Sequence, residues 1–338
     1  MRAVVLRRHG PPEVLRVGDV PLPEPGDGQV AVRVETVGLN YAEVLSRRGQ
    51  YGWSPRLPYI LGMEAAGRIE ALGPNVTSRS VGERVVVGSQ FGAYAERIVV
   101  PQAGAMPAPE DYSADELAAF PVNYMTAWVA LMEMARLRPS DRVIVTAAAG
   151  GVGTAAVQIA SRFGCEVLGL AGGDEKLSRV RDLGATATVN YREPEFARRL
   201  DEVVGDRGVD VVLETVGGEV YRRCLASLAP FGRVVVVGYA SMNLVKWNPL
   251  TWWRTWRDAP RADIQELAVA SAGVLASHLG YLLADEARLL RVQRDLVEFV
   301  RSHGIRPVVG ATFPFDEVAQ AHRFMESRRS VGKIVLKM

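Results

Sequence analysis

The chain has 338 residues, of which 48% are hydrophobic and 23% charged, and its formal net charge is +2. A chain of this length predicts two domains, and so small a net charge gives no reason to expect a nucleic-acid partner. The two cysteines, Cys165 and Cys224, are too few for a disulfide framework or a cysteine-rich zinc site, which is typical of a cytoplasmic protein. No stretch approaches about 18 uninterrupted apolar residues, so we expect no membrane span.

Residues up to about 120 predict short strands and turns. The stretch GQVAVRVETVGLN alternates valines with polar residues from Gln29 to Glu35, which predicts a strand with one exposed face. GERVVVG and GAYAERIVVP predict two further strands, each bounded by Gly or Pro. From Ser113 the spacing becomes helical, and Ser113 with Glu116 forms a capping-box signature.

From Asp141 onward, predicted strands and helices alternate strictly. This alternation predicts a parallel, doubly wound sheet with helices on both faces. The predicted strands are 142–146, 166–170, 188–190, 209–214 and 233–237, and the predicted helices are 152–163, 175–183, 195–204 and 219–228. The rest of the chain, from about Ala287, predicts a helix to His303, a strand, a helix over 315–328 and a final strand in GKIVLKM.

Small residues separate the first of these strands from the first helix, in TAAAGGVGTAAVQIA. The pattern Ala148-x-Gly150-x-x-Gly153 is a variant of the dinucleotide-binding fingerprint, with Ala in the first position. Gly150 and Gly151 permit a tight turn, and Gly153 lets the helix approach the sheet. The N–H groups at the helix start, including that of Val152, would face a pyrophosphate. Tight packing of helix on strand with no ligand is the alternative explanation.

The end of the second predicted strand indicates which dinucleotide is bound. NAD enzymes usually carry an acidic residue there, but this chain has Gly172 and Gly173, with Lys176 one helical turn later. A cation without the acid favours a 2′-phosphate, so NADPH is expected rather than NADH. Two observations leave the choice open: Asp174 could still reach a ribose hydroxyl, and Lys176 could be a solvated helix residue.

Seven segments together carry a resemblance to a known family. They are VGLNYAEVLSRRGQY, LGMEAAGRIEALG, VNYMTAWVAL, AAAGGVGTAAVQIA, DLGATATVNY, DVVLETVGG and VGKIVLKM. The chain resembles the medium-chain dehydrogenase/reductase superfamily over essentially its whole length, and within it the zinc-free, zeta-crystallin-like quinone oxidoreductases. LVKWNPLTWWRTWRDAPRAD and GVLASHLGYL are similar to the vesicle amine transport protein subfamily.

The resemblance implies a two-domain α/β protein. A GroES-like, β-rich catalytic domain would comprise residues 1–121 and 277–338, and a Rossmann NADP-binding domain residues 122–276. The substrate would lie in the cleft between them. GVLASHLGYL would be an edge strand that pairs across the two-fold axis of a homodimer.

The resemblance also implies zinc-free chemistry. Zinc alcohol dehydrogenases of this superfamily carry Gly-His-Glu where this chain has Gly62-Met63-Glu64, and a Cys ligand near the position of Asn40. Met is a poor zinc ligand, so no zinc is predicted. We expect an NADPH-dependent reductase of a quinone or an apolar α,β-unsaturated carbonyl, because hydride addition to a conjugated system delocalises the charge without a metal. A zinc-free NAD alcohol dehydrogenase is disfavoured, since no residue replaces the metal.

The site residues follow from matching positions in the family. Asn40, Tyr41 and Tyr51 would orient the substrate carbonyl, although Asn40 could be a turn residue and Tyr51 a loop anchor. Glu64 is expected to brace the structure rather than act as a base. Further cofactor contacts would come from Thr126, Tyr191, Val216, Gly238, Tyr239, Ser241 and Lys333. Tyr191 would cover the 2′-phosphate, and Lys333 is either near the cleft or a solvated strand charge.

Four tryptophans, Trp247, Trp252, Trp253 and Trp256, lie within ten residues among basic side chains. They could pack in the chain or at a dimer interface, or they could roof an apolar substrate pocket. Trp252, Trp253 and Trp256 could instead make peripheral contact with a membrane. This last interpretation supports an alternative function, a non-catalytic nucleotide-binding protein associated with vesicles or membranes.

Overall fold

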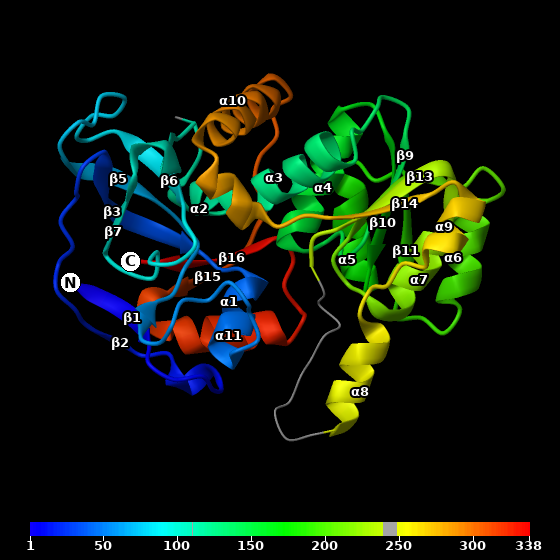
Figure 1. Cartoon of the computed structure of the whole chain (residues 1–338), viewed down its shortest axis with the longest axis horizontal. Coiled ribbons are helices and arrows are strands. Elements are labelled where there is room, and N and C mark those ends of the chain that lie inside the picture. The colour runs from blue at the N-terminus through cyan, green and yellow to red at the C-terminus, as the bar shows by residue number, and fades with distance from the viewer. Residues whose placement is uncertain (110, 239–248) are drawn as a thin grey trace. The chain divides into compact units, whose positions relative to one another are not determined.

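The computed structural model describes residues 1–109, 111–238 and 249–338. The chain folds into two compact units (Figure 1): unit 1 is Met1–Met125 together with Gly280–Met338, and unit 2 is Thr126–Leu279. Unit 2 is therefore one continuous segment, whereas unit 1 is completed by a segment that follows unit 2 in the sequence.

Unit 2 is built on a six-stranded parallel sheet with the strand order β11-β10-β9-β12-β13-β14. All four residues of β9, near the centre, are buried, as expected for a strand covered on both faces. This is the predicted doubly wound sheet. Its strands are β9 (Arg142–Val145), β10 (Glu166–Ala171), β11 (Ala187–Asn190), β12 (Val209–Glu214), β13 (Leu228–Val236) and β14 (Gly273–Ala276), and its helices are α4 (Gly151–Arg162), α5 (Asp174–Asp182), α6 (Phe196–Val204), α7 (Gly218–Ala226), α8 (Pro249–Asp258) and α9 (Ile264–Ala270).

The ends of the elements in unit 2 differ from the prediction at a few places. The helix predicted over 219–228 ends at Ala226, because Leu228 already pairs with Val209 at the start of β13. For the same reason β13 begins earlier than the strand predicted over 233–237. Of the segment GVLASHLGYL, predicted to be an edge strand, only Gly273–Ala276 forms a strand, β14, which occupies one edge of the sheet; from Leu279 the segment is the short helix η4 (Leu279–Ala284).

Unit 1 is built on a seven-stranded sheet with the order β15-β16-β3-β5-β6-β8, to which β7 is added beside β3. Only Arg33 of β3 is exposed, rather than a whole face, because helix α2 packs against this strand. A second sheet has the order β2-β1-β4. The strands are β1 (Arg2–Leu6), β2 (Val17–Asp19), β3 (Gln29–Gly38), β4 (Tyr59–Ile60), β5 (Glu64–Leu72), β6 (Arg84–Gly88), β7 (Arg97–Pro101), β8 (Ala105–Pro107), β15 (Val309–Pro314) and β16 (Lys333–Lys337).

The helices of unit 1 lie between and after these strands. The longest is α10 (Glu286–Ser302), whose Leu289, Val292, Leu296 and Val300 form one buried stripe at helical spacing. The other helices are α1 (Tyr41–Arg48), α2 (Ala114–Ala118) and α11 (Val318–Glu326), with the short helices η1 (Pro12–Val14), η2 (Gln102–Gly104), η4 (Leu279–Ala284) and η5 (Phe315–Glu317), and α3 (Pro121–Trp128) contains the boundary between the two units.

The helical segment predicted from Ser113 begins as expected but is interrupted. The Glu116 N–H donates to the Ser113 hydroxyl at 3.2 Å, and the Ser113 N–H donates to the Glu116 carboxylate at 2.8 Å, so the capping box is confirmed. Pro121 has no N–H to continue α2 and instead begins α3. A π-helical turn, η3 (Val129–Met134), follows.

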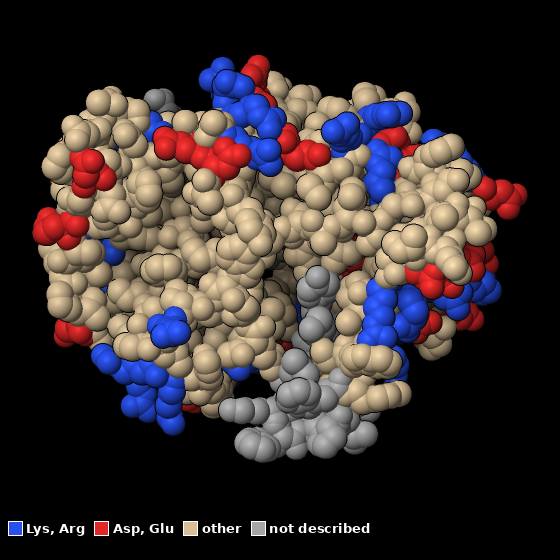
Figure 2. All heavy atoms as spheres, viewed as in Figure 1, with Lys and Arg blue, Asp and Glu red and all other residues tan. Residues whose placement is uncertain are grey.

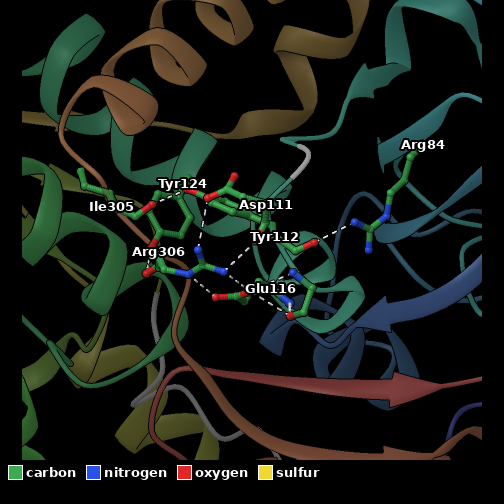
Figure 3. A network of polar contacts seen from close by, with 8 residues as sticks. Arg84, Asp111, Tyr112, Glu116, Tyr124, Ile305 and Arg306 are labelled. Atoms are coloured by element: carbon green, nitrogen blue, oxygen red, sulfur yellow. Dashed lines mark hydrogen bonds and ion pairs between the residues drawn. The ribbon is translucent and has the colours of Figure 1, made fainter.

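A network of polar contacts joins the two segments that make up unit 1 (Figure 3). The Tyr112 hydroxyl donates to the carbonyl of Ile305, and the Tyr124 hydroxyl donates to the carbonyl of Arg306 at 3.2 Å. The Arg306 guanidinium binds Glu116 at 2.8 Å. These contacts fix the part of the returning segment that follows α10 against the residues that precede unit 2.

Candidate functional site

The glycine motif forms the turn between β9 and α4. The Gly150 N–H donates to the Ala147 carbonyl at 2.8 Å, and Gly150 is the N-cap residue of α4. A glycine cap offers no side-chain acceptor, and in the described part of the chain the N–H groups of Gly151, Val152 and Gly153 have no hydrogen-bond partner. Free donors at a helix N-terminus favour a phosphate ligand.

Gly153 is required by the packing of this turn. A Cβ at Gly153 would lie 2.2 Å from the Ala147 carbonyl oxygen and 2.7 Å from the Ala148 Cα, and neither backbone atom can move cheaply. A Cβ at Gly150 would lie 3.2 Å from the same oxygen, which is tight but not overlapping. Close packing therefore explains Gly153, while the free N–H groups remain available to a ligand.

The turn lies where the sheet order reverses, since β10 and β12 flank β9. In doubly wound sheets this switch point is where ligands bind, at the carboxyl ends of the strands. Here the Thr215 N–H donates to the Thr146 hydroxyl at 2.8 Å, which ties the ends of β9 and β12 together. The geometry therefore places the glycine turn at the position expected of a nucleotide site.

Glu214 is a buried carboxyl at this edge that sequence reasoning did not identify. Its Oε1 accepts the N–H groups of Val216 and Gly217, each at 2.5 Å, and so shapes the turn before α7. Burial raises the pKa of Glu214 to about 7. The predicted contact Val216 is half-buried in this turn. The strand-end position of Glu214 in DVVLETVGG was the signal available in the sequence.

Two cations converge at the end of β10. The parallel pairing of Ala171 with Asn190 brings Gly172 close to the residues after β11. The Arg192 side chain lies over Gly172, where a Cβ would approach the Arg192 Nε to 2.6 Å. Lys176 is half-buried in the first turn of α5, and its pKa is lowered by burial and by the charge of Arg192.

Arg192 is a second residue that sequence reasoning missed. It follows Tyr191, which is half-buried and whose N–H donates to the Ala171 carbonyl at 3.2 Å. A basic residue directly after the third strand was the available signal. Asp174, the acid that could have favoured NADH, is exposed at the start of α5.

The other predicted cofactor contacts lie in different parts of unit 2. Thr126 is half-buried in α3, and Gly238 follows the end of β13. Tyr239 and Ser241 lie outside the described residues.

A buried polar cluster in unit 1 joins β5, β16, α3 and the N-cap of α1. We call it the Lys333 cluster, and it comprises Lys333, Glu64, Asn40 and Asn123. The Lys333 ammonium pairs with Glu64 and donates to the Oδ1 of Asn40 at 2.7 Å and of Asn123 at 3.4 Å. Its side chain is only 2% exposed. Lys333 is therefore not a solvated strand charge, and its three hydrogens all face oxygens of unit 1.

Asn40 uses both of its amide hydrogens within unit 1. Its Nδ2 donates to Glu64 at 2.9 Å and to Glu43 at 3.4 Å, while its Oδ1 faces Lys333. Asn40 is also the N-cap residue of α1. In this arrangement the Asn40 amide has no further hydrogen to donate to a substrate carbonyl. Glu64, which also accepts the Val122 N–H at 2.7 Å, braces the structure.

Glu43, in the first turn of α1, is a further buried polar residue next to the Lys333 cluster. It accepts hydrogen bonds from the Asn40 N–H at 2.8 Å, the Met63 N–H at 2.8 Å and the Tyr94 hydroxyl at 2.6 Å. The Tyr94 hydroxyl also lies 3.1 Å from His322 Nε2. Burial raises the pKa of Glu43 to about 7 and lowers that of His322 to about 3, so His322 is neutral.

Tyr41 and Tyr51 lie at the two ends of the α1 region and are both half-buried. Tyr51 shares a hydrogen bond with the Gln90 side chain, and burial raises its pKa. Together with Tyr59 and Met63, Tyr51 lines a cavity of about 10 Å³. This cavity has room for about one water molecule. The structure thus places Tyr51 beside Glu43 and Met63.

Comparison with known proteins identifies the family. Family models match residues 26–110, as an alcohol dehydrogenase GroES-like domain, and 183–336, as a zinc-binding dehydrogenase. The synaptic vesicle membrane protein VAT-1 homolog of Rattus norvegicus is 34% identical, over 99% of this chain and 84% of its own. The quinone oxidoreductase of Homo sapiens is 32% identical, over 99% of this chain and 97% of its own. The chain belongs to the medium-chain dehydrogenase/reductase superfamily.

Within this superfamily, its relatives are quinone oxidoreductases and VAT-1 homologs, as the sequence motifs predicted. The quinone oxidoreductase of Thermus thermophilus, also solved in complex with NADPH, is 36% identical, with a TM-score of 0.80 and complete coverage of both chains. The predicted fold class, a GroES-like domain with a Rossmann domain, is confirmed.

The position that carries a zinc-ligating His in related alcohol dehydrogenases is Met63 in this medium-chain dehydrogenase/reductase. Met63 is 8% exposed, and its N–H donates to the Glu43 carboxylate at 2.8 Å. Within residues 1–109, 111–238 and 249–338, no three His, Cys, Asp or Glu side chains gather closely enough to hold a metal ion.

The tryptophan segment of this family member forms α8. Trp253 is 55% exposed and Trp256 63% exposed, so neither packs into the core. Arg257 stacks over Trp253 at 5.1 Å, and Arg261 over Trp256 at 3.8 Å. Trp247 and the side chain of Trp252 lie outside the described residues. None of the described helices combines the length and apolar composition needed to cross a bilayer.

Proposed function

We propose that this chain is an NADPH-dependent reductase of quinones or α,β-unsaturated carbonyls that needs no zinc. The observation that carries the proposal is the pair Lys176 and Arg192 beside Gly172, at the strand end where NAD enzymes place an acid. Two cations at this point favour the 2′-phosphate that distinguishes NADPH from NADH. The NADPH complex of the Thermus relative supports the same choice.

The residues of unit 2 fit this cofactor. The free N–H groups of Gly151, Val152 and Gly153 suit its pyrophosphate, and the space that a Cβ at Gly153 would occupy is taken up by backbone. Tyr191, Thr126, Val216 and Gly238 remain proposed contacts, as do Tyr239 and Ser241. When bound, NADPH supplies a hydride to the acceptor.

Unit 1 would orient the acceptor. Tyr41 and Tyr51 are the proposed donors to its carbonyl oxygen, since both amide hydrogens of Asn40 are used inside unit 1. Asn40 and Lys333 then act as positioning residues rather than as direct contacts. A conjugated acceptor suits a site with Met63 in place of a zinc ligand. The negative charge that develops on the acceptor as hydride adds is delocalised over an enolate or quinol, so no metal is needed to stabilise it.

The experiment that tests this proposal compares NADPH and NADH binding to the wild type and to the Lys176→Ala/Arg192→Ala double variant. We expect the double variant to bind NADPH more weakly by about tenfold or more and NADH almost unchanged, because only the 2′-phosphate contacts are lost. Arg162→Ala, at an exposed position on α4, is the control and should bind both cofactors as the wild type does.

Turnover completes the test. NADPH oxidation is followed by absorbance with a panel of quinones and enones, using protein checked for metal by elemental analysis. Tight NADPH binding without turnover on any acceptor would contradict the reductase, and stoichiometric zinc in the active protein would contradict the zinc-free mechanism.

A second candidate function is peripheral membrane binding, which the exposed Trp253 and Trp256 favour. Aromatic side chains with stacked arginines suit the interface of an anionic bilayer. Co-sedimentation with anionic liposomes tests this function. If the Trp253→Ala/Trp256→Ala variant no longer co-sediments with the liposomes but still reduces quinones, the two functions are separate.

We also propose that the protein is a homodimer that pairs through β14. This strand has one free edge in the sheet, among the residues that the structure describes. On the neighbouring helix α9, Ile264 is 76% exposed and Val269 90% exposed, and no residue of α9 is buried. Exposed apolar side chains beside a free strand edge suit a contact between two copies.

A further inference from the structure

A groove of about 530 Å³ lies on β1 and β2 of unit 1. Ala3 and Val5 alternate onto one face of β1, and Gly18 of β2 pairs with Ala3. A Cβ at Gly18 would meet no atom within 4 Å, so the groove is open above this glycine. The floor therefore consists of small and apolar residues, continued by Val14 and Val17.

Arginines line the groove. Arg7, Arg8 and Arg16 are exposed, and none of them forms an ion pair or a side-chain hydrogen bond with another residue in the part of the chain that the structure describes. Of the two acidic lining residues, Glu13 is paired with Arg323, which leaves Asp19. Figure 2 shows basic side chains gathered on the face over β2 and the segment before it. The groove thus carries an excess of positive charge.

We infer that this groove binds a small anionic amphiphile, with its carboxylate or phosphate head at Arg7 and Arg16 and its apolar tail over Val5 and Gly18. The arginines favour the anionic head of such a molecule, and the apolar floor of the groove favours its tail. The volume lies within the range of about 300–1,000 Å³ for small-molecule sites. A protein partner would need a contact of about 800 Å² on each side, which so small a groove does not offer.

The site is distinct from the nucleotide site of unit 2. It involves none of Lys176, Arg192 and the glycine turn, so it stands whether or not the protein reduces quinones. A ligand here would bind without competing with NADPH.

Isothermal titration calorimetry of the full chain tests the inference, with octanoate as the probe and 1-octanol and acetate as its tail-only and head-only counterparts. Octanoate should bind saturably at one site, and each counterpart should bind at least tenfold more weakly. Arg7→Gln/Arg16→Gln should weaken octanoate at least tenfold. Gly18→Leu should abolish binding, because its side chain fills the open space and Gly18 has no positive φ that would strain the variant.

The control is Arg199→Gln/Arg222→Gln, which removes two exposed arginines from unit 2 and should leave octanoate binding unchanged. Thermal unfolding of each variant checks that it is folded. Absence of saturable octanoate binding, 1-octanol binding as tight as octanoate, or equal weakening in the control would overturn the inference. Binding to phosphatidylglycerol vesicles that needs Arg7 and Arg16, without octanoate binding, would assign the groove to a membrane surface and would also overturn it.

Discussion

At the centre of unit 1, the ammonium group of Lys333 meets the side-chain oxygens of Glu64, Asn40 and Asn123. Each charge is stable there only because the other is present, since water does not reach either group. Removing one partner leaves the other buried and unpaired, which costs more than the pair contributes.

Lys333→Met should therefore lower the free energy of unfolding by about 3–5 kcal/mol. Adding Glu64→Gln to this variant should restore part of the loss, because the buried negative charge is then gone. Urea unfolding measures both effects. Lys337→Met, at an exposed position of the same strand, is the control, and an equal loss in that variant would exclude a special role for the buried pair.

Asn40, Tyr51 and Lys333 could be named from the sequence because they lie in recognisable motifs. Their partners could not be, because Lys333 and Asn40 are 293 positions apart, and no local pattern shows that they meet. For the same reason the sequence alone also allowed Lys333 to be a solvent-exposed charge on the final strand. Arg192 was missed because its place over Gly172 depends on the parallel pairing of β10 with β11.

At the scale of elements, the β9–α4 turn contains two glycines, Gly150 and Gly153, that look equivalent in the sequence but tolerate an added Cβ differently. Gly153→Ala would place its Cβ against immobile backbone, whereas Gly150→Ala would meet one oxygen at 3.2 Å. We expect Gly153→Ala to lower the free energy of unfolding by about 3 kcal/mol and to abolish NADPH binding, and Gly150→Ala to cost about 1 kcal/mol or less. Chemical unfolding and NADPH titration compare the two, and equal effects would contradict this account of the turn.

The Arg306–Glu116 contact ties the returning segment to α2, and it makes stability depend on pH. Arg306 lowers the pKa of Glu116 to about 2, below its ordinary value of about 4.3. The contribution is therefore complete above about pH 5 and is lost as the pH falls toward 2. Arg306→Gln should destabilise the protein by about 1 kcal/mol at pH 7, a small value because Arg306 is half exposed.

The measurement for Arg306→Gln is urea unfolding of both proteins from pH 7 to pH 2. The difference between wild type and variant should shrink as the pH falls. A difference that stays constant down to pH 2 would show that Arg306 acts through packing against Tyr112 instead of through its charge.

Most elements of unit 2 could be predicted because strand and helix periods alternate clearly there. The failures have local causes: in unit 2, Leu228 joins β13 because of its pairing with Val209, and in unit 1, Pro121 divides one predicted helix. The small β1–β2 sheet and η1 have no comparable periodicity in so few residues.

For the whole molecule, the exposed edge of β14 and the apolar face of α9 predict assembly. Val269→Arg should shift the protein from dimer to monomer, because it replaces an exposed apolar side chain of α9 by a charge that is costly to bury between two copies. Light scattering after size exclusion measures the mass in solution. Val81→Arg, at an exposed apolar position of unit 1, should leave the dimer intact; a wild type that is already monomeric would contradict the proposed assembly.

The order of the units along the chain came from the resemblance to a family and not from periodicity, because nothing in residues 1–125 shows that the sheet they form lacks two strands. Those strands are β15 and β16, and β16 lies between β15 and β3. During synthesis, residues 333–337 leave the ribosome only after all of unit 2 has emerged. Unit 2 can thus fold while it is being made, whereas β3 keeps one hydrogen-bonding edge unpaired until residues 333–337 have been added, and an unpaired strand edge exposes the newly made chain to aggregation during this interval.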